Sequence, residues 1–207
     1  MRIGLLGGAF NPPHLGHLKL AELALQQLEL DELRFVPTAV SPHKPSVQGP
    51  DSISRLDLLK AALKGFPGPV KIEMAELDRG GTSYCVDTLE TLAQREPGCG
   101  WILVLGSDQL PGLPKWRRFA RVMELASVAV AARPGFDEAL PDILKGRERP
   151  RWSGAPGEIV WLPGTGLPYE SSALRLDLGQ LSDQAATVEG LSPQVMAVIT
   201  AENHYRN

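Results

Sequence analysis

GGAFNPPHLGHL, from Gly7 to Leu18, follows a strand-like apolar run over residues 2–8 and opens a helical pattern over residues 16–30. Glycines let a backbone approach a ligand closely, while prolines stiffen the turn and remove backbone donors. The N-terminus of a helix favours anions, so this junction is a natural phosphate site. It contains neither GxGxxG nor GxxxxGK[ST], which disfavours a Rossmann dinucleotide site and a P-loop.

The rest of the chain continues the alternation of strand and helix. Apolar faces at helical spacing, such as Leu18, Ala21, Leu25 and Leu28, support the helices. The pattern predicts an α/β fold with a doubly wound, mainly parallel sheet and helices on both faces. Ligands of such sheets bind at the carboxyl ends of the strands. The expected strands are 2–8, 32–38, 70–77, 100–108, 127–135 and 158–164, and the expected helices are 16–30, 53–66 (with Leu56, Leu59 and Leu63 on one face), 83–96, 115–126, 171–180 and 192–203.

Composition narrows the class of protein. The 207 residues are 43% hydrophobic and 22% charged, which suits one soluble domain, 1–207. The net charge of −3 gives no basic field for nucleic acid. We expect a cytoplasmic protein, because the apolar runs are too short to cross a membrane, no signal peptide is evident, and Cys85 and Cys99 make no disulfide framework.

Residues 135–157 interrupt the alternation of strands and helices. They are rich in proline, glycine and charge. We expect a flexible excursion with one or two helical turns. A C-terminal helical portion follows from about residue 171.

His14 and His17 lie three residues apart in the opening stretch. The spacing permits a shared metal, but no carboxylate or cysteine nearby completes a ligand set. A purely structural role, with His17 capping the helix and His14 filling the turn, is the alternative. A histidine in a first helical turn should stay neutral, because the dipole repels a cation. Two neutral imidazoles there could hold a transferring phosphate.

A second stretch near the other end, YESSALRLDL, has the same character. Ser171 and Ser172 stand where a helix begins, and Arg175 falls in its first turn. Serine alone is a good N-cap, but arginine has the wrong charge for that end of the dipole. A bound polyphosphate would resolve the mismatch, and a solvated surface arginine is the alternative.

These motifs resemble those of a known family. GGAFNPPHLGH is similar to the G-x-F-[ND]-P-x-H-x-G-H signature of the nucleotidyltransferase superfamily, and SSALR to its second motif, usually I-S-S-T-x-x-R. Over nearly its whole length the chain resembles the bacterial nicotinate mononucleotide adenylyltransferases. The further matching stretches are VPTAVSPHKP (36–45), GGTSYCVDTL (80–89), LGSDQL (105–110), LPKWRRF (113–119) and AARPG (131–135).

The resemblance implies a Rossmann-like nucleotidyltransferase fold and the transfer of AMP from ATP to nicotinate mononucleotide, with release of pyrophosphate. The attacking phosphate is already an anion, so positioning and charge neutralisation suffice. Mg²⁺ would be held mainly by phosphates and water. The implied partners are these two small molecules, with no nucleic acid and no membrane.

The resemblance also assigns roles to residues. It makes His14, His17 and Arg175 catalytic, with the two histidines gripping the phosphates. Trp116 would stack on the pyridine, and the backbone N–H groups of residues 82–84 would meet its carboxylate. The implied ATP-binding residues are Gly7, Gly8, Phe10, Lys44, Gly106, Asp108, Ser171 and Ser172, and the implied mononucleotide-binding residues are Thr82, Ser83, Tyr84, Cys85, Trp116 and Arg133.

Four positions depart from the family pattern. Glu170 replaces an apolar residue, and we expect it to point away from the polyphosphate; Ala173 and Cys85 replace threonines, and Gln109 replaces an asparagine. Cys85 bears on selectivity between nicotinate and nicotinamide. Transfer to nicotinamide mononucleotide or phosphopantetheine, a catalytically inactive nucleotide-binding regulator, and an α/β protein without a phosphate site are the alternative functions.

Overall fold

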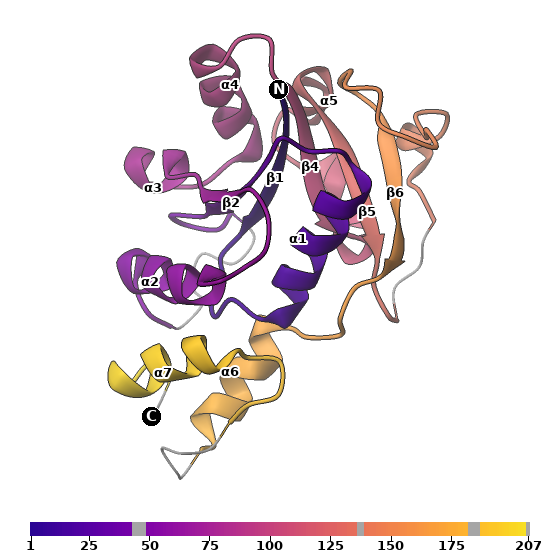
Figure 1. Ribbon diagram of the computed structural model, residues 1–207. Coiled ribbons are helices and arrows are strands. Elements are labelled where there is room, and N and C mark those ends of the chain that lie inside the picture. Colours follow the sequence, from indigo (N-terminus) through magenta and orange to yellow (C-terminus); the bar gives the residue numbers. More distant parts are fainter. Residues whose placement is uncertain (43–48, 136–138, 182–186, 206–207) are drawn as a thin grey trace.

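The computed structural model describes residues 1–42, 49–135, 139–181 and 187–205. Its centre is a six-stranded parallel sheet in the order β3-β2-β1-β4-β5-β6, which winds outward in both directions from β1 (Figure 1). This confirms the predicted doubly wound fold. The strands are β1 (Arg2–Gly8), β2 (Glu32–Pro37), β3 (Val70–Ile72), β4 (Gly100–Gly106), β5 (Ala126–Ala132) and β6 (Ile159–Thr165).

Both faces of the sheet are buried, as expected of parallel strands. Alternate residues of β1 show the division: Ile3 and Leu5 face one core, and Leu6 faces the other. Helices α4 (Cys85–Arg95) and α5 (Phe119–Leu125) pack on the first face, and α1 (Leu15–Gln27) packs on the second.

A third core lies beside the sheet, at the bottom of Figure 1. It joins α2 (Ser52–Leu63) to the C-terminal helices α6 (Ser171–Gly179) and α7 (Pro193–Ala201). Leu58 of α2, Leu174 of α6 and Ile199 of α7 are almost fully buried there. The predicted C-terminal helical portion is therefore attached to the sheet through α2.

Two expected elements differ from the structure by more than three residues at one end. The strand expected over 70–77 ends at Ile72, and its second half forms the short helix α3 (Ala75–Arg79). The helix expected over 115–126 begins only at Phe119, because the 3₁₀ helix η1 (Ser107–Lys115), with Pro111 and Pro114 inside it, precedes it. Proline lacks the N–H that an α-helical ladder needs.

Most residues of the predicted apolar faces of the first two helices are buried or pack against a core. Ala21 and Leu28 are buried as expected, and Leu18 and Leu25 are half-buried and pack against the core on that face of the sheet. On α2 the expected Leu56 and Leu63 are likewise half-buried. The buried stripe of α2 is instead Arg55, Leu58, Leu59 and Ala62.

The described part of the excursion, residues 139–157, contains one short 3₁₀ helix, η2 (Asp142–Leu144). It is anchored by Leu144 and Trp152, which are 0% and 3% exposed. The Arg2 guanidinium lies 4.8 Å over the Trp152 ring. This anchor is at the amino ends of β1 and β4, and the flexibility of the excursion stays a prediction. Among the described residues no helix is both long and apolar enough to span a bilayer.

Candidate active site

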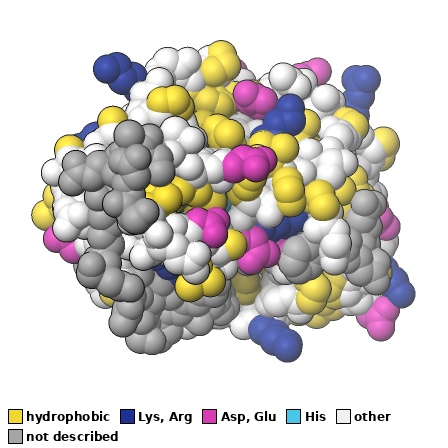
Figure 2. Space-filling model, turned by 90° about the horizontal axis from the view of Figure 1, so that it is seen from below, with side chains coloured by type: hydrophobic (Ala, Val, Ile, Leu, Met, Phe, Trp, Pro, Cys, Tyr) yellow, Lys and Arg dark blue, Asp and Glu magenta, His cyan; other side chains and the backbone are white. Residues whose placement is uncertain are grey.

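A cleft of about 970 Å³ opens at the carboxyl ends of the central strands. Figure 2 views the molecule from this side, where acidic and basic side chains gather near the middle of the face. Gly7 and Gly8 end β1, Gly106 ends β4, and the starts of α1, α4 and α6 complete the wall. The cleft is therefore where a doubly wound sheet is expected to bind its ligand.

The structure brings nearly all of the sequence-predicted residues to this cleft. Thr82 does not line it: its side chain is exposed, and its backbone forms a β-bridge with Val40. Lys44 lies outside the described residues. The predicted residues that line the cleft are Gly7, Gly8, Phe10, His14, His17, Ser83, Tyr84, Cys85, Gly106, Asp108, Trp116, Arg133, Ser171, Ser172 and Arg175.

Phe10 packs beneath the loop of the site, and its ring is too buried to contact a nucleotide. It is 1% exposed and adopts a left-handed backbone, with φ of 46°. Its ring meets the edge of His17 at 5.0 Å and packs on Phe35 at 5.9 Å, measured between centroids. A Cβ at Gly8 would lie only 3.3 Å from this ring, so glycine lets Phe10 fold under the loop.

His14 and His17 form a pair at the start of α1. Their ring centroids are 3.8 Å apart, and the backbone N–H of His14 donates to Nδ1 of His17 at 3.2 Å. A neutral imidazole that accepts at Nδ1 carries its proton on Nε2, which is then free to donate to a ligand. Nδ1 of His14 is buried without a hydrogen-bond partner among the described residues.

Both histidines are neutral at pH 7. Burial lowers the pKa of His14 to about 4, and the nearby Arg133 cation acts in the same direction. Burial also holds the pKa of His17 well below its usual value, with His14 and Arg133 adding to the effect. The predicted neutrality follows, but its main cause is burial rather than the helix dipole.

The first turn of α1 leaves fewer backbone N–H groups available to an anion than the sequence suggested. The N–H of Leu15 donates to the carbonyl of Gly190 at 2.8 Å. The N–H groups of His17 and Leu18 turn back to the carbonyl of His14. In the described part of the chain, Gly16 is left as the first-turn amide without a backbone acceptor.

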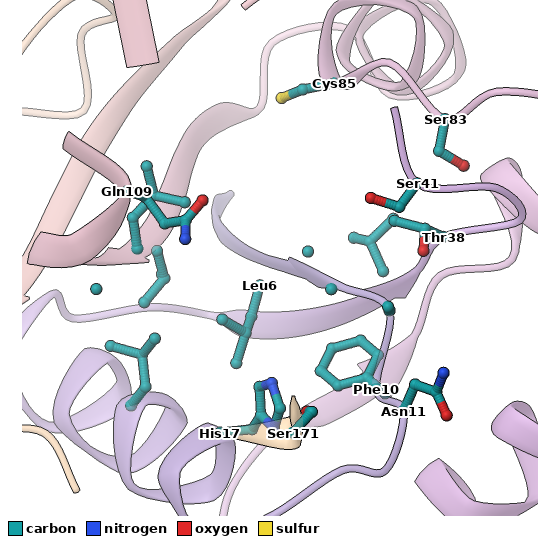
Figure 3. Close-up of a pocket in the computed structure, with 18 of the residues that line it drawn as sticks. Leu6, Phe10, Asn11, His17, Thr38, Ser41, Ser83, Cys85, Gln109 and Ser171 are labelled. Atoms are coloured by element: carbon teal, nitrogen blue, oxygen red, sulfur yellow. The ribbon is translucent and has the colours of Figure 1, made fainter. Parts of the chain in front are cut away.

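The start of α6 lies against the loop between β1 and α1. Arg175 donates to the carbonyl of Asn11 at 2.7 Å, and the Ser171 hydroxyl donates to the carbonyl of Pro12 at 3.0 Å. The two motifs singled out in the sequence are therefore one structural unit. Figure 3 shows Ser171 beside His17 at one side of the cavity.

Arg133 is surrounded by acceptors. It donates to Asp108 at 2.9 Å and to the carbonyl of Tyr169 at 2.9 Å, and it lies 3.3 Å from the Glu170 carboxylate. The expectation that Glu170 points away from the site was wrong: it lines the cleft and pairs with Arg133. This pairing gives the extra carboxylate a place beside the site without leaving its charge unopposed.

The opposite end of the cavity is formed by the start of α4 and by Trp116. Cys85 and Ser83 lie across the cavity from His17 in Figure 3. The N–H of Ser83 donates to the carbonyl of Val40 at 2.9 Å, so it is already used within the fold. Burial raises the pKa of the Cys85 thiol, which therefore stays protonated. Trp116 does not begin a helix as expected but follows η1 in an extended conformation.

Comparison with known proteins agrees with this geometry. Residues 5–176 match the cytidylyltransferase-like family model. The chain is 36% identical over 196 residues to a probable nicotinate-nucleotide adenylyltransferase of Methylibium petroleiphilum, covering 95% of this chain and 88% of that protein. It belongs to the cytidylyltransferase-like family, among the nicotinate-nucleotide adenylyltransferases.

One further relative supports this membership in the adenylyltransferase family, and one solved structure supports the fold. The Bacillus subtilis nicotinate-nucleotide adenylyltransferase is 39% identical over 140 residues, which cover 68% of this chain and 74% of that one. The Plasmodium falciparum nicotinic acid mononucleotide adenylyltransferase complexed with NaAD superposes with a TM-score of 0.75, covering 99% and 97% of the two chains. At 19% sequence identity, this second likeness shows the shared fold.

Sequence reasoning missed several residues of this adenylyltransferase cleft. Arg55 is 6% exposed and donates to the carbonyls of Ala9 and Thr38, tying two loops together. The signal in the sequence was that Arg55, a charged residue, lies one helical turn before the apolar Leu59. Glu76 is equally buried in the wall, where burial raises the pKa of its carboxyl. Asn11 stands in the opening motif, yet its side chain had no assigned role.

Proposed function

We propose that the protein transfers AMP from ATP to nicotinate mononucleotide, giving nicotinate adenine dinucleotide and pyrophosphate. One observation carries the proposal: the neutral His14–His17 pair, joined by the bond from the His14 backbone N–H to His17, meets Arg175 of α6 at the loop between β1 and α1, at the strand ends of a chain from this family. That set provides phosphate donors and positive charge, and the lowered pKa values make both imidazoles weak bases. It suits a reaction that depends on positioning rather than on acid–base chemistry.

The reaction follows from the charges. A phosphate oxygen of the mononucleotide attacks the α-phosphorus of ATP, and the bond from that phosphorus to the bridging oxygen of the β-phosphate breaks. The attacking phosphate brings its own negative charge, so no base has to remove a proton. His17, with its proton on Nε2, donates to the phosphates. Arg175 offsets the charge spread over the reacting phosphoryl oxygens.

The two ends of the cavity bind different parts of the substrates. We place the reacting phosphates beside His17, Ser171 and Arg175. We place the pyridine between Trp116 and the start of α4, where Tyr84 and Cys85 line the wall. The structural neighbour that is described as complexed with NaAD supports a dinucleotide product bound in this fold.

We propose that Mg²⁺ accompanies ATP and neutralises the leaving pyrophosphate. Asp108 and Glu170, two carboxylates of the cleft, are both paired with Arg133. Within the described residues, no three histidine, cysteine or acidic side chains gather as a metal site. Both observations suit an ion that is held by phosphate oxygens and water. We also propose a cytoplasmic location, which suits the free thiols of Cys85 and Cys99.

Nicotinamide mononucleotide is the second candidate acceptor. The N–H of Ser83, one of the donors expected to meet a nicotinate carboxylate, already bonds the carbonyl of Val40. A loss of donors at this end weakens the discrimination between an acid and an amide.

The test is pyrophosphate release by the purified protein with ATP and Mg²⁺. Nicotinate mononucleotide, nicotinamide mononucleotide and phosphopantetheine are supplied in parallel. We expect turnover with nicotinate mononucleotide well above the other two. Equal use of both pyridine nucleotides would leave the proposed mechanism intact but would contradict the assignment of nicotinate mononucleotide as the preferred acceptor. Turnover with phosphopantetheine alone, or with none of the three, would contradict the proposal.

A further inference from the structure

Asn11 connects the cleft to the C-terminus of the chain. It is 6% exposed and lines the cleft. Its carbonyl accepts from Arg175, and its side-chain oxygen accepts from the hydroxyl of Tyr205 at 2.7 Å. Tyr205 is 194 residues further along the chain and does not itself line the cleft.

The side chain of Asn11 is confined on a second side by Gly49. A Cβ at Gly49 would lie 2.6 Å from Oδ1 of Asn11 and 2.7 Å from its Nδ2, so the two residues are in tight contact. The Tyr205 hydroxyl is thus one of the groups that fix the amide in place. Burial raises the pKa of Tyr205, so the hydroxyl keeps its proton and remains a donor at neutral pH.

The segment from Asn11 to Leu15 is short and stiff. Pro12 and Pro13 have restricted backbones, so a shift at Asn11 is passed on to His14. Described residues from the C-terminal part of the chain bond this segment: Ser171 contacts Pro12, Arg175 and Tyr205 contact Asn11, and Gly190 contacts Leu15. Tyr205 is the one among them that acts through the Asn11 side chain.

The Tyr205 hydroxyl is not needed to dock the C-terminal helix. Helix α7 already buries Val195, Met196 and Ile199 in the third core, and the ring of Tyr205 packs against the same core. Removing only the hydroxyl therefore leaves the apolar docking surface intact. Its hydrogen bond has a consequence elsewhere, at the loop that carries the histidines.

We propose that Tyr205 is a positioning residue for the reaction: its hydroxyl fixes the Asn11 side chain, and through it the loop that carries His14 and His17. The proposal rests on the proposed function, since it concerns the geometry of the same phosphate site. The C-terminus thereby takes part in transition-state alignment without touching a substrate.

The experiment compares Tyr205→Phe with the wild type in two measurements. We expect kcat to fall about tenfold, as for loss of one hydrogen bond that aligns reacting groups. KM for nicotinate mononucleotide should stay within about twofold of its wild-type value, because the pyridine end is not affected. Hydrogen–deuterium exchange should become faster in a peptide covering residues 9–17, whether or not the protein turns over.

Ser192→Ala is the matched control. Ser192 caps α7 by accepting from the N–H of Val195 at 3.3 Å, so the variant loosens the same helix without touching Asn11. It should lower the melting temperature but leave kcat and exchange over residues 9–17 at their wild-type values. In the double variant with Asn11→Ala, Tyr205→Phe should add no further loss of kcat.

The outcomes separate the two proposals. Lack of turnover by the wild type would reject the proposed function, and the exchange measurement would then decide on Tyr205. Wild-type exchange and kcat in Tyr205→Phe, or equal effects in Ser192→Ala, would overturn the positioning role. An additive loss in the double variant would show that the hydroxyl does not act through Asn11.

Discussion

At the phosphate end of the cleft (Asn11, His14, His17, Ser171 and Arg175), hydrogen bonds join segments from opposite ends of the chain. At the base end (Ser83, Tyr84, Cys85 and Trp116), the connections are more local, and the N–H of Ser83 is used within the fold. The phosphate end is therefore fixed by the fold before a ligand arrives, which is what charge alignment requires. We propose that the base end selects by shape and stacking, so single changes there should have smaller effects.

The largest effect is expected at His17. His17→Ala removes a preorganised phosphate donor, so kcat should fall about 10²–10³-fold, the range for loss of one such donor. The measurement is steady-state pyrophosphate release, with circular dichroism to check the fold. Lys19→Ala is the control on the same helix, since among the described residues Lys19 forms an ion pair with Glu22 alone, on the surface. A fall in kcat of less than tenfold in His17→Ala would mean that a change at the phosphate end has no larger effect than a change at the base end.

Arg175 tests whether position or charge matters at the phosphate end. Arg175→Ala loses both and should lower kcat about 10²-fold, as expected when a charged donor is removed. Arg175→Lys retains the charge but not the planar guanidinium that reaches Asn11, and it should recover only part of the loss. Full recovery in the kinetic assay would show that charge alone is sufficient there.

At the base end, the Trp116 ring should affect binding rather than chemistry. Stacking on a base contributes about 1–3 kcal/mol, so Trp116→Ala should raise KM for the mononucleotide about 5–150-fold. kcat at saturation should change little, and Trp116→Phe should restore most of the affinity. A fall in kcat at unchanged KM would mean that the two ends of the cleft are not separate.

The smallest effect is expected at Cys85. Since burial raises its pKa, the thiol should react with iodoacetamide at pH 7.5 far more slowly than an exposed cysteine. Cys85→Thr should shift the preference for nicotinate over nicotinamide mononucleotide by less than about tenfold, the range of one weak polar contact. Rapid alkylation, or a reversal of preference, would show that the base end depends on this one side chain.

The sequence predicted the two ends with unequal success, and the reasons are physical. At the phosphate end, glycine, proline, histidine and arginine stand in short motifs, and the chemistry of these motifs can be predicted from the sequence alone. Arg55 and Tyr205 were not predicted from the sequence. Their roles depend on contacts with distant loops, and no local sequence pattern encodes such contacts. At the base end, Thr82 does not line the cleft, and no local pattern predicted the backbone bridge that it forms with Val40.

The fold itself was predictable from the alternation of buried strands and amphipathic helices. The errors came where proline altered the helix type, as at Pro111 and Pro114, and where a short apolar run suited either element, as over residues 70–77. The orientation of Glu170 was wrong because an isolated carboxylate was considered without its partner Arg133. The Glu170 error concerns a tertiary contact, whereas the other two concern local backbone preferences.

The most direct test of the account is a ¹⁵N–¹H NMR titration of the histidine side chains. The proposed chemistry depends on neutral imidazoles at the phosphate end, and burial keeps them neutral because it disfavours the cation and lowers the pKa. His14 should therefore stay neutral until the pH falls to about 4, and His17 should carry its proton on Nε2 at pH 7. Titration of either residue near pH 6.5, or a proton on Nδ1 of His17, would contradict it.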